Sequence, residues 1–81
     1  MHTILEKEIQ PYEYAFCENV KRLREEKKMS QMELAHLCDL SVGTIDRMER
    51  FILPEGMYLS DVIALAYALG VTPSELLLTT S

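Results

Sequence analysis

SQMELAHLCDLSVGTIDRMER, residues 30–50, decides the fold because two helix starts lie within it, separated by a short turn. Ser30 and Glu33 have the spacing of a capping box, in which each side chain binds a free backbone N–H group at the start of a helix. Ser41 can cap a second helix by accepting from the backbone N–H groups of its first turn. The sequence therefore predicts two short helices, at 31–38 and 42–50.

An apolar pair at hydrophobic-staple spacing brackets each cap: Met29 with Leu34, and Leu40 with Ile45. Only about four residues remain for the turn, so the two helices must cross steeply, as in a helix-turn-helix motif. The faces that these helices bury are predicted to carry Leu34, Ala35, Cys38, Ile45 and Met48.

The composition fits one small domain. The chain has 81 residues, of which 48% are hydrophobic, enough for a single packed core. A chain of this length buries only about 60% of the surface that its unfolded form exposes, so oligomerisation would add stability. No run approaches the roughly 20 apolar residues of a membrane helix, and the N-terminus lacks the basic start and apolar run of a signal peptide. We therefore expect a cytoplasmic protein.

The charged residues are distributed unevenly along the chain. The net charge is −5, with −3 in residues 1–20, +1 in residues 21–50 and −3 in residues 51–81. Seven of the eight basic residues lie in the central segment, together with six acidic residues. A strong DNA-binding domain usually has a markedly basic face. Taken alone, the charges around Lys21–Lys28 therefore indicate a solvated helix face with mixed ion pairs.

Residues 1–11 are polar, with scattered apolar positions and no clear period. A disordered arm, a short helix and a partner-binding strand all remain open, with disorder favoured. Pro11 suits the first turn of a helix, where its missing N–H costs nothing, and Lys27 and Lys28 suit the C-terminal end. The apolar residues between them recur every three or four positions and form one stripe: Tyr12, Phe16, Val20 and Leu23.

The C-terminal part contains two further helix patterns. A helix is predicted over 59–69 with Gly70 as a left-handed stop, and its buried face should carry Leu59, Val62, Ile63, Ala66 and Leu69. Thr72-Pro73-Ser74-Glu75 supplies another capping box, which predicts a last helix over 73–78 and a tail at 79–81. The sequence therefore predicts an all-α, compact five-helix bundle whose domain spans 12–78.

Residues that could carry catalysis or bind metal do not form a recognisable pattern. Cys17 and Cys38 are expected to be reduced, buried thiols, and neither they nor His2 and His36 show the closely spaced ligand pairs of a zinc site. Neither a Ser-His-Asp order nor a glycine-rich phosphate loop is visible. We expect neither an enzyme nor a cofactor.

Short motifs then follow one another in a fixed order from Val20 to Leu77. They are VKRLR at 20–24, MSQ at 29–31, ELA at 33–35, LS at 40–41, TI at 44–45, MER at 48–50, ALAYALGVT at 64–72 and ELL at 75–77. In this order and spacing the chain resembles the phage-repressor/Cro-type, or XRE-like, helix-turn-helix DNA-binding domain. Each motif alone is weak, whereas their combination is specific.

The resemblance implies a lambda-repressor-like fold and a transcriptional regulator that binds double-stranded DNA at a palindromic operator as a homodimer. Residues 1–11 and the Leu76–Leu78 end are the candidate dimer faces. Arg24 and Glu49 match a structural ion pair of the family. The residues implied at the DNA are Gln31 at a phosphate, and Ser41, Val42, Gly43, Thr44, Arg47 and Arg50 on or beside the recognition helix.

Several residues depart from the family's pattern. Asp39 and Phe51 stand where glycine is usual, and Asp46 puts a carboxylate near the DNA face. An alternative is therefore open, in which the fold serves as a protein-interaction or antitoxin-like module with weak or no DNA binding. Its contact patch would be Phe51, Ile52 and Leu53. The opposing interpretation is that Phe51 and Leu53 close the core.

Overall fold

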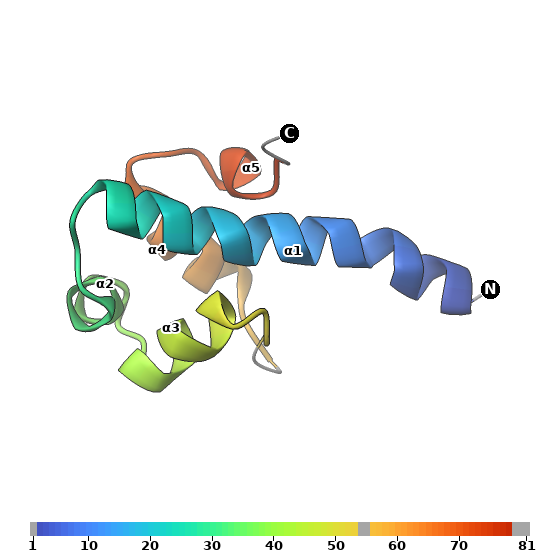
Figure 1. Ribbon diagram of the computed structural model, residues 1–81, viewed down its shortest axis with the longest axis horizontal. Coiled ribbons are helices and arrows are strands. Elements are labelled where there is room, and N and C mark those ends of the chain that lie inside the picture. Colours follow the sequence, from blue (N-terminus) through green and yellow to red (C-terminus); the bar gives the residue numbers. More distant parts are fainter. Residues whose placement is uncertain (1, 54–55, 79–81) are drawn as a thin grey trace.

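The computed structural model describes residues 2–53 and 56–78, with side chains from Tyr12 onwards, so the tail predicted at 79–81 lies outside the described residues. The described residues form five helices and no strand: α1 (His2–Glu26), α2 (Gln31–Cys38), α3 (Val42–Glu49), α4 (Leu59–Leu69) and α5 (Pro73–Leu76). In Figure 1, α2 and α3 lie below α1, α5 lies above it, and α4 lies behind. The prediction of an all-α five-helix bundle is confirmed.

The predicted caps are present at three helix starts. The Ser30 hydroxyl accepts from the backbone N–H of Glu33 at 3.0 Å, and the Glu33 carboxylate accepts from the N–H of Ser30 at 2.7 Å. Thr72 and Glu75 exchange the same two hydrogen bonds at α5, at 3.3 and 2.8 Å. Ser41 caps α3 through a backbone N–H of its first turn, at 3.1 Å. Each such cap contributes about 1 kcal/mol, so these residues fix where α2, α3 and α5 begin.

All four turns between helices use left-handed backbone, beginning with Lys28 after α1, which has φ 57°. Asp39 after α2 has φ 56°, Phe51 after α3 has φ 66°, and Gly70 after α4 has φ 74°. Glycine adopts this conformation freely, whereas other residues do so at a cost of roughly 1–2 kcal/mol. The left-handed stop predicted at Gly70 is confirmed, and Asp39 gives the helix-turn-helix its short turn.

The core lies where α1 meets the other four helices. Its buried residues come from all five helices: Phe16, Cys17, Val20, Leu34, Ala35, Cys38, Ile45, Met48, Leu65, Ala66, Leu69 and Leu76. The five residues predicted to be buried in α2 and α3 are all among them. The prediction for α4 is partly wrong, because Leu59 and Ile63 are exposed and Leu65 is buried instead. Sequence periodicity could not separate the two faces of α4, since apolar residues occupy both.

α1 is longer than predicted. It begins at His2, so residues 2–11 are helical and Pro11 lies inside the helix instead of in its first turn. Proline in a helix interior costs about 3 kcal/mol, which is the reason the sequence favoured a start there. The N-terminal part of α1 projects beyond the other helices (Figure 1). Tyr12, predicted as part of the buried stripe, is therefore exposed, whereas Phe16 and Val20 are buried.

A buried amide holds the end of the chain against α1. The side-chain NH2 group of Asn19 donates to the backbone carbonyls of Leu76 at 2.9 Å and Leu78 at 2.8 Å. Carbonyls at a helix C-terminus have no partner within the helix, so Asn19 completes the last turn of α5. This contact was missed because one asparagine in an amphipathic helix has no distinctive spacing. It leaves Leu76 buried and Leu77 and Leu78 exposed.

Candidate nucleic-acid interface

The helix-turn-helix is fixed to α1 by an ion pair. The Arg24 guanidinium binds both carboxylate oxygens of Glu49, at 2.6 and 3.0 Å, and also donates to the backbone carbonyl of Met29 at 2.6 Å. The side chains of Arg24 and Glu49 are 12% and 5% exposed. The hydrogen bond that Arg24 donates to the Glu49 carboxylate raises the pKa of Arg24 above its already high ordinary value. The predicted pair is present, and it ties the end of α3 to α1 and to the start of α2.

Polar contacts continue from this pair onto the surface of α3. The Gln31 side-chain NH2 group donates to Glu49 at 3.0 Å and to Asp46 at 3.3 Å. The second carboxylate oxygen of Asp46 lies 3.2 Å from Nε of Arg50. Gln31 thus stands at the start of α2, as the resemblance implied, but its NH2 group faces the carboxylates of α3. This network was not predicted from the sequence, although the i,i+4 spacing of Asp46 and Arg50 is a signal for an ion pair.

The outward face of α3 brings together most of the predicted DNA-binding residues. α3 packs against α1 and α2 through buried Ile45 and Met48. The exposed residues on its other side are Val42, Gly43, Arg47 and Arg50. Ser41 and Thr44 lie at the start of the helix, where their hydroxyl oxygens are 2.8 Å apart. This face is continuous with Gln31 through Asp46.

The start of α3 is open to close approach. A Cβ atom built at Gly43 would meet only the Ser41 hydroxyl, at 3.9 Å. Packing within the domain therefore does not require glycine here. A glycine at this position leaves backbone accessible beside the exposed Val42 side chain, and such a surface can contact the edge of a base pair closely.

The two arginines of this face differ in their partners. Arg50 is paired with Asp46, both of them partly or largely exposed, and such surface pairs contribute only about 0–1 kcal/mol. Arg47 is exposed and has no ion-pair partner in the described part of the chain. Its planar guanidinium is therefore free to donate two hydrogen bonds to one acceptor edge, as guanine presents in the major groove.

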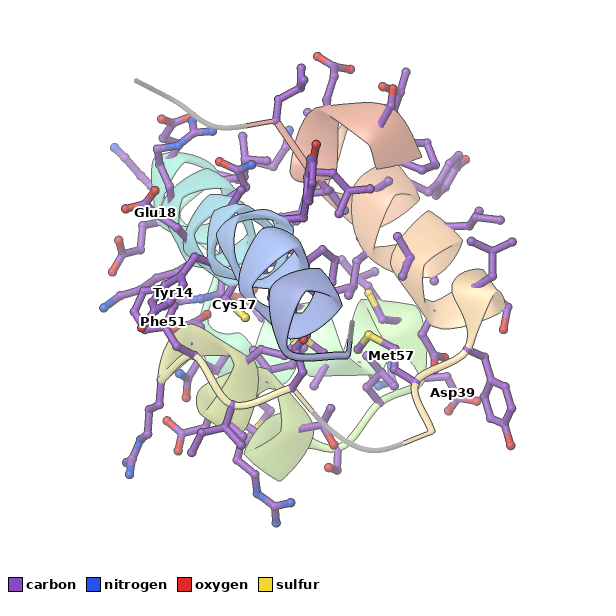
Figure 2. All side chains as sticks on the ribbon, turned by 90° about the vertical axis from the view of Figure 1, so that its right-hand side faces the viewer. Tyr14, Cys17, Glu18, Asp39, Phe51 and Met57 are labelled. Carbon is purple, nitrogen blue, oxygen red and sulfur yellow. The ribbon has the colours of Figure 1, made fainter. Side chains whose placement is uncertain are left out.

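Two interpretations were made for residues 51–53 in the loop after α3: an exposed contact patch, or side chains that close the core. The structure has features of each. The Phe51 ring lies against Tyr14, with ring centroids 5.0 Å apart and an interplanar angle of 43° (Figure 2). Leu53 is partly buried against the core, whereas Ile52 is exposed. Leu53 thus packs on the core and Phe51 rests one face against α1 at Tyr14, but Phe51 and Ile52 remain 47% and 53% exposed.

The two cysteines are free and buried. Burial, with a smaller contribution from Glu13, raises the pKa of the Cys17 thiol to about 11, and burial also raises that of Cys38. Both thiols are therefore protonated at neutral pH and act as small apolar side chains. Among the residues that the structure describes, no cluster of His, Cys, Asp and Glu could hold a metal ion, and no helix is long and apolar enough to cross a membrane.

Comparisons with known proteins agree with this geometry. The family model of the Cro/C1-type helix-turn-helix DNA-binding domain matches residues 19–80. The crystal structure of a hypothetical transcription factor, NHTF from Neisseria, superposes with a TM-score of 0.76 and 32% sequence identity. The match covers 85% of this chain and 77% of that chain. No curated protein matches the chain significantly.

Proposed function

Because the chain belongs to the family of Cro/C1-type helix-turn-helix DNA-binding domains, we propose that it is a sequence-specific transcriptional regulator that binds a palindromic operator as a homodimer. The observation that carries the proposal is the outward face of α3. It combines Arg47, which no carboxylate pairs with among the described residues, with open backbone at Gly43 on a helix tied to α1 by the Arg24–Glu49 pair.

In the proposed complex α3 lies in the major groove with its N-terminal residues at the base edges. Arg47 donates two hydrogen bonds to the O6 and N7 atoms of a guanine, and Val42 contacts a thymine methyl group. Ser41, Thr44 and Arg50 lie beside them, within reach of the sugar-phosphate backbone. Gln31 contacts a phosphate at the start of α2, where backbone N–H groups also favour an anion.

A homodimer follows from the size of the contact. One helix-turn-helix module buries too little surface for a tight and specific complex. Two copies related by a twofold axis read two half-sites about 34 Å apart, and their symmetry matches a palindrome.

Selection of binding sequences from a random DNA pool tests this function. We expect enrichment of an inverted repeat whose half-sites contain a guanine. Failure to enrich any sequence, together with stoichiometric capture of one protein partner, would instead support the alternative of a protein-interaction module. Substituting Ile52 would then be the first change to examine, since that side chain is exposed in the loop after α3.

Asp46 is expected to reduce binding to random DNA. Its carboxylate lies on the DNA side of α3 and engages both Arg50 and Gln31, two of the residues proposed to contact the DNA backbone. In water a unit charge about 4 Å from a phosphate changes the energy by about 1 kcal/mol. Asp46→Asn is therefore expected to tighten binding to random duplex by roughly two- to fivefold at low salt. The dependence of log K on log salt should steepen by about one unit per copy.

Fluorescence polarisation at several salt concentrations measures both quantities. Glu18→Gln is the matched control, because Glu18 is an exposed carboxylate on α1 (Figure 2) and its loss changes the net charge equally. An equal gain in both variants would mean that only net charge matters. Unchanged or weaker binding by Asp46→Asn would contradict the role given to this carboxylate.

A further inference from the structure

The solvent side of α4 presents a stripe of large apolar side chains. Leu59, Ile63 and Tyr67 are 73%, 49% and 88% exposed. Their spacing of four residues places them on one side of the helix, opposite the buried Leu65 and Leu69. This stripe is called the α4 face below.

The α4 face contains no charge. The only charged residue of α4 is Asp61, whose carboxylate accepts from the backbone N–H of Tyr58 at 3.1 Å and so serves the helix start. A surface helix normally has polar and charged residues on its outer side, and a helix that is apolar all round is normally covered on both sides. The residues described here cover only one side of α4, since α1, α2 and α5 all pack on its inner side.

We propose that the α4 face is the interface of the homodimer and that its occupant is the same face of a second copy. This inference rests on the proposed function, which requires a dimer. A twofold interface brings one surface patch against itself, so a patch that carries net charge of one sign repels its own copy. The chain has a net charge of −5, with −3 in residues 51–81. Within that acidic part, Leu59, Ile63 and Tyr67 offer an apolar surface that can meet itself without repulsion.

The arrangement of the helices makes this interface compatible with DNA binding. In Figure 2, α3 lies along the lower side of the molecule and α4 along the right side. Consider a twofold axis that runs vertically in this view, just outside α4. Rotation about this axis brings the α4 helices of two copies together. It leaves both α3 helices on the lower side. Both recognition helices can then face one DNA duplex, as a palindromic operator requires.

Sedimentation equilibrium of two charge-matched variants tests the proposal. Ile63→Glu places a carboxylate in the centre of the α4 face. In the dimer the two introduced carboxylates, one from each copy, would face each other across the twofold axis. Leu78→Glu places the same charge on an exposed apolar residue of the Leu76–Leu78 end, which is the other dimer face considered. We expect the dimer dissociation constant to rise by at least roughly 100-fold in Ile63→Glu, because truncated or charged central residues dominate interface losses. It should stay within about threefold of the unmodified protein in Leu78→Glu.

Circular dichroism tests whether both variants keep the helical fold. Ile63→Asn is measured alongside as an uncharged polar replacement. We expect it to weaken the dimer less than Ile63→Glu does. The α4 face would be excluded as the interface if Ile63→Glu dimerised as well as the unmodified protein, or if Leu78→Glu dissociated the dimer instead. Either result would leave the proposal of a DNA-binding homodimer intact. An unmodified protein that stays monomeric on operator DNA would overturn both the interface and the proposed homodimer.

Discussion

Replacing Glu49 with alanine is expected to lower the free energy of unfolding by about 3–5 kcal/mol, since it removes one partner of a buried ion pair. Arg24 would keep a charge that is only 12% exposed, and Gln31 would lose its 3.0 Å acceptor. A domain of this length is stable by only about 4–12 kcal/mol in total. The variant should therefore be close to unfolding at room temperature.

Urea denaturation followed by circular dichroism measures the loss. Glu26→Ala is the matched control, because it removes the 3.1 Å pair between Arg22 and Glu26, whose side chains are 41% and 59% exposed. Exposed pairs of this kind contribute only about 0–1 kcal/mol. Equal effects of the two substitutions would show that the Arg24–Glu49 pair does not hold the helix-turn-helix in place.

Replacing Arg47 with alanine is expected to remove most of the sequence specificity. A bidentate contact with guanine is worth about 1–3 kcal/mol of discrimination per half-site. Two half-sites then give about 2–6 kcal/mol, which is a loss of roughly 30-fold to 10⁴-fold in affinity for the operator. Binding to random duplex should weaken much less, because each copy loses only one contact with the phosphates.

Polarisation titrations with operator and random duplex separate these two effects. Lys21→Ala provides the control, since Lys21 is an exposed basic residue of α1 and its loss changes the net charge by the same amount. If Arg47→Ala and Lys21→Ala weakened operator binding equally, Arg47 would act only through its charge and would not read a base.

Local signals explain why much of the fold was predictable from the sequence. The capping boxes at Ser30 and Thr72 and the staples beside them involve residues a few positions apart, and such contacts depend little on the rest of the structure. The buried faces of α2 and α3 were also predicted, because the positions of the caps fix which apolar residues turn inward, even though Met32 and Leu37 on the outer side of α2 are apolar and exposed. Where both sides of a helix are apolar, as in α4, periodicity cannot identify the buried side.

Non-local contacts account for what the sequence missed. Gln31 and Asp46 are 15 positions apart, and Asn19 binds the carbonyl of Leu76 from 57 positions away. Nothing in the residue pattern brings these pairs together before the helices have packed. The candidate DNA-binding residues were found through a family resemblance, and the contacts that restrain Gln31 and Arg50 became visible only in the folded chain.

The affinity ratio between operator and scrambled duplex tests the central claim most directly. The measurement is a polarisation titration of the unmodified protein with the selected palindrome and with a duplex of the same composition in scrambled order, at physiological salt. Sequence-specific regulators bind their sites about 10³-fold or more tightly than other DNA, and this is the ratio we expect. Equal affinity for the two duplexes would contradict sequence-specific DNA binding by this protein.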